Sequence, residues 1–356
     1  MNYRDIAEFY KNKTVLITGH TGFKGAWLSQ WLKLLGANVI GYGLETTDNT
    51  KLFEKLSLKN QITHYNKDIN NLNELNLVFQ KHSPEIVFHL AAQAIVKTSY
   101  ENPIETFETN VIGTTKVLEA IKNCKSVEVA ILVTSDKCYK NDEKQFGFNE
   151  NDPLGGDDPY SASKACSELV INSYRKSFFE HSSKKIVSVR AGNILGGGDW
   201  SKDRIVVDVI NSIENNNEIL LRDPNAVRPW QHVLDASYAY LKTAYFTSIT
   251  ENYELAWNFG PSDTDVTTVE QLVKQIISVY GKGSYKALSK KQYHEAHFLK
   301  LNVTKAETLL EWKLIYKQET LIKKTVEWYL DFKNQKSAKN ITLKQIEDYI
   351  KIIDTL

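Results

Sequence analysis

Three adjacent polar residues, Ser135, Asp136 and Lys137, carry side chains that can hydrogen-bond or transfer protons. They follow directly after a mostly apolar run, and the stretch 129–139 is typical of a buried strand that ends in a polar turn. In open α/β sheets, ligands bind just beyond the carboxyl ends of the parallel strands. The stretch therefore predicts the mouth of a binding site that contains these three side chains.

A second polar cluster, 158–164, is predicted to begin a helix. Asp158 is a favourable N-cap and Pro159 a favourable first helical residue. Tyr160 and Lys164 should then lie one turn apart on the same face. A phenol is a poor base at neutral pH, but a neighbouring ammonium group favours the phenolate, so we expect Lys164 to lower the pKa of Tyr160. In isolation, a tyrosine and a lysine at this spacing most often lie on the surface without a catalytic role. Because this pair follows a dinucleotide-binding pattern in the chain, a catalytic role is favoured.

That pattern is a glycine turn near the N-terminus. Residues 13–18 read as a strand, three glycines follow, and 26–35 has helical apolar spacing. Glycines permit a tight turn and close approach to a pyrophosphate, which the free N–H groups at the helix start attract. The Gly-x-x-Gly-x-x-Gly spacing differs from the usual fingerprint and also suits an ordinary turn, but its place in a βαβ pattern favours cofactor binding. The expected contacts are Gly19, Thr21, Gly22, Phe23, Lys24 and Gly25.

Further cofactor contacts are expected after the next strands. Glu45 is placed to bind ribose hydroxyls, although a solvated loop acid explains it equally well. No arginine between Gly25 and His64 could pair with a 2′-phosphate, which favours NAD over NADP. Asn110, among apolar neighbours, is either a buried polar anchor or a surface residue. The other candidates, which follow strands predicted over 62–66 and 86–90, are Asp68, Ile69, Leu90, Ala91, Ala92 and Gln93.

The composition of the 356-residue chain excludes several classes of function. Lysine plus arginine number 44 and aspartate plus glutamate 43, so no global charge favours nucleic acid or a membrane surface. The three cysteines are few and not spaced as a metal site, which fits a reducing compartment. The start of the chain is polar, and no run of about 20 apolar residues occurs. We expect a soluble cytoplasmic protein without a bound metal.

The order of the predicted elements indicates an α/β protein with a Rossmann-type doubly wound parallel sheet and a smaller α/β C-terminal substrate-binding lobe. Residues 1–190 are expected to form the cofactor-binding domain, which includes the serine, tyrosine and lysine. Residues 191–356 are expected to form mainly the lobe, with some segments returning to the sheet. Strand-like pieces at 218–221 and 256–259 lie between helical stretches, and the tail, 319–353, reads as amphipathic helix.

The second half of the chain supplies candidate substrate contacts. Arginine offers a planar fork for phosphate oxygens, and tryptophan offers a face on which a base or sugar can stack. Arg222 and the run 228–232 fit this description, although a structured turn would also explain the run. The substrate-binding candidates are Gln93, Lys97, Ser135, Asn193, Trp200, Arg204, Arg228, Trp230 and His232.

Together, these motifs resemble those of the extended short-chain dehydrogenase/reductases and, within that group, the CDP-glucose 4,6-dehydratases. The resemblance covers almost the whole chain. Its general marks are the glycine turn and Tyr160-x-x-x-Lys164. Where the related dTDP-glucose enzymes have Asp-Glu, this chain has Asp136-Lys137, and Lys97 stands where relatives tend to carry arginine. The specific marks are 134–139 (TSDKCY), 89–93 (HLAAQ), 190–193 (RAGN), 196–200 (GGGDW) and 228–232 (RPWQH).

The resemblance implies an internal redox cycle on CDP-glucose. Tyr160, held as phenolate by Lys164, would accept the 4-hydroxyl proton while Ser135 hydrogen-bonds that oxygen, and NAD would take the C4 hydride. Asp136 would protonate the departing 6-hydroxyl, and the hydride would return to C6 to give CDP-4-keto-6-deoxyglucose. Lys137 would either remove the C5 proton, if burial lowers its pKa, or stay cationic and stabilise the enolate.

Three alternatives stay open at the level of sequence. A dehydratase for a dTDP- or GDP-sugar is one, because no residue distinguishes cytosine from thymine by its chemistry. A nucleotide-sugar 4-epimerase shares the fold, NAD and the Tyr/Lys pair, but has no leaving hydroxyl for Asp136 to protonate. A non-catalytic NAD-binding protein would not need the serine, tyrosine and lysine together. The resemblance also implies a homodimer, with a homotetramer as the alternative, and a place in O-antigen or capsule deoxysugar synthesis.

Overall fold

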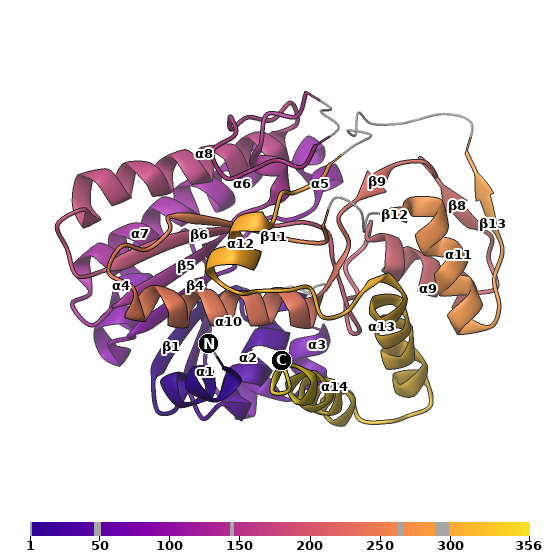
Figure 1. The fold of residues 1–356 in the computed structure, drawn as a ribbon, viewed down its shortest axis with the longest axis horizontal. Coiled ribbons are helices and arrows are strands. Elements are labelled where there is room, and N and C mark those ends of the chain that lie inside the picture. Colours follow the sequence, from indigo (N-terminus) through magenta and orange to yellow (C-terminus); the bar gives the residue numbers. More distant parts are fainter. Residues whose placement is uncertain (1, 46–50, 143–145, 263–266, 289–298) are drawn as a thin grey trace.

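The computed structural model of the protein describes residues 2–45, 51–142, 146–262, 267–288 and 299–356 (Figure 1). Its centre is a seven-stranded sheet with the strand order β11-β6-β5-β4-β1-β2-β3, and every neighbouring pair in it is parallel. The order reverses at β1, as in a doubly wound fold. The strands are β1 (Thr14–Thr18), β2 (Asn38–Gly43), β3 (Thr63–Asn66), β4 (Ile86–His89), β5 (Val129–Val133), β6 (Lys185–Ala191) and β11 (Ala256–Phe259).

Helices cover both faces of this sheet because alternate strand residues point in opposite directions. In β1, Val15 and Ile17 join the core shared with α1, α2 and α10, whereas Leu16 joins the core shared with α4, α7 and α8. The central strands are buried on both faces, which is typical of parallel sheets, whereas the edge strand β3 is partly exposed. The helices on the first face are α1 (Tyr3–Tyr10), α2 (Phe23–Leu34) and α10 (Val233–Ile249), and those on the second are α4 (Leu72–His82), α7 (Gly113–Asn123) and α8 (Pro159–Tyr174).

Shorter elements connect these helices and strands. The helix expected from residue 103 onward contains a π-helical turn, η2, between α6 and α7, and α8 continues into a second π turn, η4. The remaining elements of this half are α3 (Lys51–Lys55), η1 (Leu58–Asn60), α5 (Val96–Glu101), α6 (Pro103–Phe107), η2 (Glu108–Ile112), η3 (Asp136–Cys138) and η4 (Arg175–Phe179).

A smaller group of elements lies beside the sheet, on the right of Figure 1. Strand β8 pairs with β13, and β9 pairs with β12, while α9 and α11 pack together. Residues 256–259, from the same half of the chain, instead form the edge strand β11 of the main sheet. The elements of this group are α9 (Ile205–Glu214), β8 (Ile219–Leu221), β9 (Val227–Arg228), β12 (Thr267–Thr268), α11 (Val269–Tyr280) and β13 (Tyr285–Ala287). Strands β7 (Ile194–Leu195) and β10 (Gln231–His232) pair with each other next to α10, and α12 (Thr304–Leu309) packs on β11.

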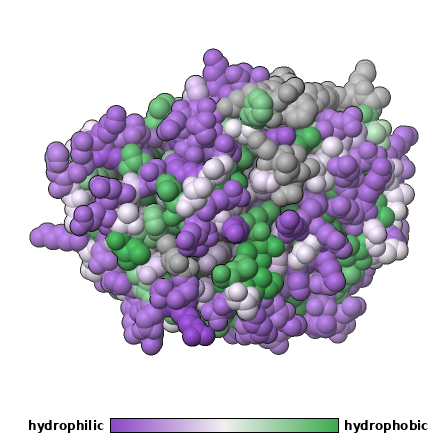
Figure 2. Space-filling view, viewed as in Figure 1, coloured by the Kyte–Doolittle hydropathy of each residue, from purple (hydrophilic) through white to green (hydrophobic). Residues whose placement is uncertain are grey.

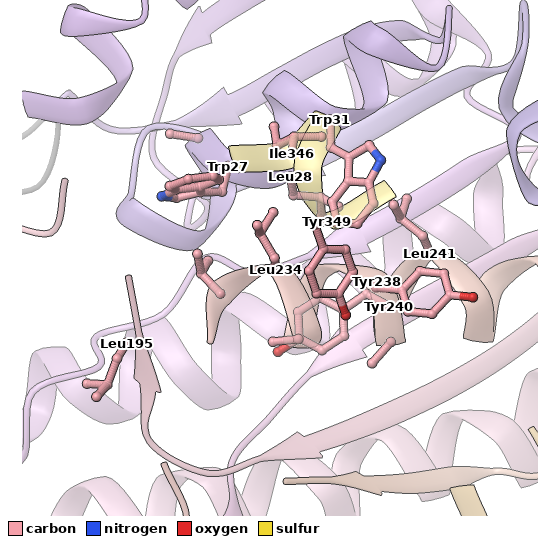
Figure 3. Close-up of a cluster of buried hydrophobic side chains, with 14 of the residues drawn as sticks. Trp27, Leu28, Trp31, Leu195, Leu234, Tyr238, Tyr240, Leu241, Ile346 and Tyr349 are labelled. Atoms are coloured by element: carbon pink, nitrogen blue, oxygen red, sulfur yellow. The ribbon is translucent and has the colours of Figure 1, made fainter. Parts of the chain in front are cut away.

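The C-terminal tail forms two helices, α13 (Gln318–Lys333) and α14 (Ala338–Ile353). α13 packs on α11, and α14 returns to α2 on the sheet. Aromatic rings fill this second contact, where the Trp31 and Tyr349 ring centroids lie 5.6 Å apart and Tyr238 packs against both rings (Figure 3). The tail therefore joins the smaller group of elements to the sheet.

The outer surface is mostly hydrophilic on the face that Figure 2 shows, with a limited hydrophobic area near its centre. Within the described ranges, no helix combines the length and the apolar character that crossing a bilayer requires. The same ranges contain no group of three or more histidine, cysteine or acidic side chains arranged to hold a metal ion.

Candidate active site

The first cluster lies where the sequence predicts it, just beyond the carboxyl end of β5. All five residues of this strand are buried, and it pairs with β4 on one side and β6 on the other. Ser135 caps the short helix η3, accepting a 3.2 Å hydrogen bond from the Lys137 backbone N–H. Its hydroxyl donates to Oδ1 of Asp136 at 2.9 Å. The turn thus holds the three side chains together at the edge of the sheet.

The second cluster begins helix α8, as predicted. The Asp158 carboxylate accepts the Ser161 backbone N–H at 2.9 Å, and Pro159 occupies the first turn. Tyr160 and Lys164 are buried on one face of the helix, with the Lys164 Nζ atom 6.0 Å from the centroid of the Tyr160 ring. α8 packs against η3, so the two clusters meet.

The electrostatics of the pair differ from the expectation. Burial raises the pKa of Tyr160 to about 12, although the Ser135 hydrogen bond and the Arg204 charge act in the opposite direction. Burial also lowers the pKa of Lys164 to about 8. Lys164 was expected to lower the pKa of Tyr160, but removing the phenolate from water outweighs any effect of the ammonium group. The resting chain therefore favours a neutral phenol.

Asp136 has the environment of a protonated carboxylic acid. Its side chain is buried, and burial raises the pKa of its carboxyl group, opposed by the Lys137 charge and the Ser135 hydrogen bond. Its Oδ2 atom has no hydrogen-bond partner among the described residues. A neutral carboxyl group can donate a proton from this oxygen, so Asp136 is suited to general acid chemistry.

A cavity of about 730 Å³ lies between these residues and the smaller group of elements. Ser135, Asp136, Lys137 and Tyr160 line its sheet side, and strand β8 lines the opposite side. A cavity of this size suits a small molecule with both apolar and charged parts. Its basic lining residues are Lys24, Lys97, Lys137, Arg204, Arg222 and Arg228, and its acidic ones are Asp136, Asp199, Asp203, Asp208, Glu218 and Asp223.

Six of the nine predicted substrate contacts line this cavity, and three do not. Gln93 lies outside the lining, because its amide is bound to the Thr106 hydroxyl at 2.9 Å and to the Ile95 backbone N–H at 2.6 Å. This side chain therefore orders its own loop. Those that line the cavity are Lys97, Ser135, Asn193, Arg204, Arg228 and Trp230.

Trp200 and His232 also lie outside the cavity lining and have structural contacts instead. The Trp200 ring packs edge-on against Trp328 and Phe332 of α13, at 5.6 Å in each case. His232 caps α10 by accepting the Leu234 N–H at 3.2 Å, and burial lowers its pKa to about 3, so the ring is neutral. Both side chains therefore make packing or capping contacts within the fold, and neither lines this cavity.

The glycine turn fits a dinucleotide cofactor. Gly19 has a φ of +73°, and a Cβ atom on it would lie 2.6 Å from the Ala91 backbone nitrogen. Gly22 caps α2 without a side-chain hydrogen bond, which leaves the first-turn N–H groups for an anion. Gly25 likewise has no room for a Cβ against the Gly19 carbonyl. The other predicted residues lie around this turn: Thr21 donates to the Leu44 carbonyl, Phe23 and Lys24 line the cavity, and Leu90 and Ala92 flank Ala91.

The predicted anchor Asn110 is buried and connects two loops of the site. Its side chain donates to the Ser163 hydroxyl at 2.8 Å and to the Gln93 carbonyl at 3.0 Å, and accepts the Gln93 N–H at 2.9 Å. Asn110 therefore fixes the segment after β4 against α8. Asp68 and Ile69 follow β3, where the Tyr42 hydroxyl donates to the Asp68 carbonyl.

Glu45 belongs to a chain of polar contacts with two histidines, His64 and His20. The sequence analysis did not identify either histidine as part of the site. Its Oε1 atom lies 2.9 Å from Lys59 Nζ and 2.7 Å from Nε2 of His64. Nδ1 of His64 lies 2.7 Å from Nε2 of His20, within the glycine turn. The Lys59 hydrogen bond lowers the pKa of Glu45, which keeps the carboxylate charged for the ribose role predicted for it.

Two acidic residues of the cavity were also missed. Asp203 lies 3.5 Å from Lys97 Nζ, so the lysine that replaces an expected arginine has a carboxylate partner. Burial raises the pKa of Asp208 to about 6, and the Asp203 charge acts in the same direction. Neither aspartate stands in a motif, and only the folded chain brings Asp203 to Lys97.

The fold and the site define an extended short-chain dehydrogenase/reductase, with its glycine turn, serine, tyrosine and lysine on one Rossmann-type sheet. Residues 16–325 match the family described as GDP-mannose 4,6 dehydratase. The chain is 41% identical to the CDP-glucose 4,6-dehydratase of Salmonella typhimurium, across 96% of this chain and 97% of that protein. The chain therefore belongs to this 4,6-dehydratase family.

More distant relatives share the fold. The chain is 24% identical to the dTDP-glucose 4,6-dehydratase of Salmonella typhimurium, over 89% of this chain and 92% of that one. The structure of the Thermotoga maritima UDP-glucose 4-epimerase with UDP-glucose superposes with a TM-score of 0.77 at 25% identity, covering 90% and 99% of the two chains. The Bacillus anthracis dTDP-glucose 4,6-dehydratase with NAD gives 0.76 at 22% identity, covering 92% and 99%.

Proposed function

We propose that the protein dehydrates CDP-glucose to CDP-4-dehydro-6-deoxyglucose in an NAD-dependent reaction. The relative that is 41% identical over nearly the full length is a CDP-glucose 4,6-dehydratase. The observation that carries the proposal is Asp136, a buried carboxyl group with a raised pKa that is hydrogen-bonded to Ser135. An elimination needs such an acid beside the oxidising residues, whereas an epimerization has no leaving hydroxyl to protonate.

The glycine turn and the start of α2 would hold the pyrophosphate of NAD, and Glu45 the ribose hydroxyls. When bound, NAD supplies a hydride acceptor for C4 of the sugar and returns the hydride to C6. Lys164 would hold the nicotinamide ribose and provide positive charge beneath the site. The small residues Ala91 and Ala92 allow this close approach, and Asn110 fixes the loop that carries them.

Tyr160 and Ser135 would perform the oxidation half of the reaction. The Tyr160 oxygen accepts the proton of the sugar 4-hydroxyl, and the Ser135 hydroxyl hydrogen-bonds the same sugar oxygen. Because burial raises the pKa of Tyr160 to about 12, this step needs a cationic group that stabilises the phenolate. Lys164, on the same helix face, is that group in its protonated form.

Asp136 and Lys137 would perform the elimination. The neutral Asp136 carboxyl group donates its proton to the departing 6-hydroxyl, which leaves as water. Lys137, which lines the cavity beside it, either accepts the C5 proton or stabilises the enolate with its charge. The 4-ketone formed in the first half acidifies the C5 proton that must leave.

The cationic residues of the cavity would bind the diphosphate of the substrate. Arg204, Arg222 and Arg228 line it, and arginine matches phosphate oxygens in geometry and charge. The cytidine would then extend toward β8, on the side away from Ser135. We keep the division into a cofactor domain, 1–190, and a part, 191–356, that is mainly a substrate lobe, with α10 and β11 returning to the sheet.

The same proposal extends to the oligomeric state, the compartment and the pathway of the protein. We infer a homodimer, or a homotetramer, that acts in the cytoplasm in the synthesis of deoxysugars such as those of O-antigen. The three cysteines are free thiols in the structure, which suits a reducing compartment. Light scattering at several protein concentrations distinguishes the two assemblies from a monomer.

The decisive experiment incubates the pure protein with NAD and, separately, with the CDP-, dTDP-, UDP- and GDP-activated forms of glucose. We expect the 4-keto-6-deoxy product from CDP-glucose, identified by mass and by nuclear magnetic resonance. Turnover of a different nucleotide sugar alone, or formation of a C4 epimer, contradicts the proposal.

A further inference from the structure

Glu168 joins three elements behind the site. It lies on α8 one turn after Lys164, is buried, and does not itself line the cavity. Its Oε1 accepts the Thr134 hydroxyl at 2.5 Å, and its Oε2 accepts the Ser188 hydroxyl at 2.9 Å and the Arg190 guanidinium at 2.8 Å. The carboxylate therefore ties α8 to the ends of both β5 and β6.

Arg190 extends this connection to the other end of the catalytic turn. Its Nη1 donates to the Tyr139 hydroxyl at 2.8 Å and to the Glu150 carbonyl at 2.9 Å. Its guanidinium carbon lies 5.0 Å from the centroid of the Tyr139 ring. The Tyr139 hydroxyl in turn donates to Oδ1 of Asn258 on β11 at 2.7 Å.

Thr134 and Tyr139 are the residues that bound the turn 135–138. One buried ion pair, Glu168 with Arg190, therefore contacts the turn at both of its ends. Glu168 itself lies on α8, which carries Tyr160 and Lys164. The relative position of the two catalytic clusters consequently depends on these contacts.

Stability alone does not account for such a pair. Burying a guanidinium and a carboxylate costs free energy that their attraction only partly returns, and apolar replacements of buried pairs are often as stable. Burial raises the pKa of Glu168, but Arg190 and the Thr134 hydrogen bond hold it below its ordinary value. Glu168 is thus an ionised carboxylate whose two oxygens both accept hydrogen bonds in fixed directions. Such a group is suited to fix the relative positions of the elements that it bonds.

We propose that Glu168 and Arg190 are positioning residues, which set the place of Ser135, Asp136 and Lys137 relative to Tyr160 and Lys164. The inference rests on the proposed function, since it assumes that these five side chains act on one sugar. Neither positioning residue lines the cavity.

The test uses Arg190→Lys, Tyr139→Phe and Glu168→Gln in the full chain. Arg190→Lys keeps a cation but loses the guanidinium group that donates to both Glu168 and Tyr139. Tyr139→Phe removes only the hydroxyl group that accepts one of these hydrogen bonds. We expect the single-turnover oxidation of CDP-glucose, followed by the absorbance of reduced nicotinamide, to slow on the order of 10²-fold in Arg190→Lys, since small displacements of reacting groups cost that much. Tyr139→Phe should show a smaller loss.

Substrate affinity separates positioning from general damage. CDP, used as the calorimetric probe, should bind to each variant within about twofold of the wild type, because the cavity arginines are unchanged. Glu168→Gln leaves a buried unpaired guanidinium and is therefore the variant most prone to unfold. Arg190→Lys and Tyr139→Phe carry the test in that case, and far-ultraviolet dichroism confirms their fold.

Asp235→Asn is the matched control. Asp235 is also a buried, hydrogen-bonded carboxyl group, but it lies outside the cavity lining and bonds the Ile315 N–H and the Tyr349 hydroxyl. Its substitution should leave the single-turnover rate unchanged. Wild-type rates in folded Arg190→Lys and Tyr139→Phe, or an equal loss in Asp235→Asn, overturn the inference. If the wild type does not convert CDP-glucose, the proposed function fails instead.

Discussion

The hydroxyl group of Ser135 donates a 2.9 Å hydrogen bond to Oδ1 of Asp136. Ser135 also hydrogen-bonds Tyr160, an interaction that opposes the rise in the tyrosine pKa. One hydroxyl group thus connects the residue for oxidation with the acid for elimination. The two halves of the reaction share a side chain, and they can be separated by substitutions on either side of it.

Substitution of Asp136 should stop the elimination and spare the oxidation. Asparagine keeps the shape of the side chain and can still accept from Ser135, but it has no acidic proton. We expect Asp136→Asn to lose about 10²- to 10⁴-fold in dehydration, the usual contribution of a general acid. Reduced nicotinamide should then accumulate with bound substrate, measured by its near-ultraviolet absorbance.

Tyr160→Phe is the comparison variant for this experiment. It lacks the group that accepts the 4-hydroxyl proton, so it should form neither reduced nicotinamide nor product. Normal dehydration by Asp136→Asn, or loss of oxidation equal to that of Tyr160→Phe, contradicts the division of labour.

The pH dependence of the oxidation should reflect Tyr160 and Lys164 together. A phenol with a pKa of about 12 gains phenolate as the pH rises, so the rate should increase from neutral pH upward. Lys164 has a pKa of about 8, so its charge is lost as the pH rises through that value, which offsets the further gain of phenolate. Single-turnover rates should therefore rise toward a pH of about 8 and then level off.

Lys164→Arg tests the origin of this plateau. Arginine keeps its charge throughout the accessible range, so any activity that the variant retains should continue to rise where the wild type levels off. A plateau at the same pH in the variant would exclude Lys164 as its cause.

Lys137 should control proton exchange at C5 of the sugar. Both proposed roles, base and enolate stabiliser, require its amine, so Lys137→Met should reduce solvent deuterium incorporation at C5 by about 10²-fold or more. Lys137→Glu distinguishes the roles, because a carboxylate can accept a proton but repels an enolate. Recovery of exchange in Lys137→Glu identifies a base, a further loss identifies a stabiliser, and unchanged exchange in both variants eliminates both roles.

Local signals made the two catalytic clusters predictable from the sequence. The N-cap Asp158 and the helix-starting Pro159 act within a few residues, and so does the apolar run of β5. The parallel sheet followed from the alternation of such strands with helices. These signals need no knowledge of distant contacts, and the structure has the same helix start and the same strand.

Long-range packing set the limits of prediction. Trp200 looked like a stacking surface, but its ring packs against α13, far along the chain. The pKa of Tyr160 depends on how many groups bury it, which spacing to Lys164 does not reveal. In the same way, the Lys97 to Asp203 contact joins α5 to the turn before α9, two segments that are distant in the sequence.

Trp200 and His232 should affect stability without affecting substrate binding. Trp200→Leu removes ring contacts with Trp328, and we expect it to lower the free energy of unfolding by about 1–3 kcal/mol. His232→Asn keeps a capping side chain and loses ring packing, with a similar cost. The KM for CDP-glucose should stay unchanged in both, whereas Arg228→Met, in the cavity, should raise it about tenfold or more. A raised KM in Trp200→Leu would return that residue to the substrate site.

Asp235 should make the protein less stable as the pH rises. Burial raises the pKa of this carboxyl group from 3.8 to about 7, although hydrogen bonds from Ile315, Tyr316 and Tyr349 oppose the shift. The folded state therefore prefers the protonated form. Its contribution to stability is complete below the ordinary pKa and is lost as the pH rises through about 7.

The loss from this one group amounts to at most about 4 kcal/mol between these limits, at 1.36 kcal/mol per pKa unit. Asparagine at this position cannot ionise, so Asp235→Asn should remove that part of the pH dependence. The free energy of unfolding of the variant, relative to that of the wild type, should therefore be higher at alkaline than at acidic pH. Urea unfolding of both proteins at pH values on either side of 7 measures the difference. Parallel stability curves for the two proteins would show that Asp235 is already ionised in the folded state.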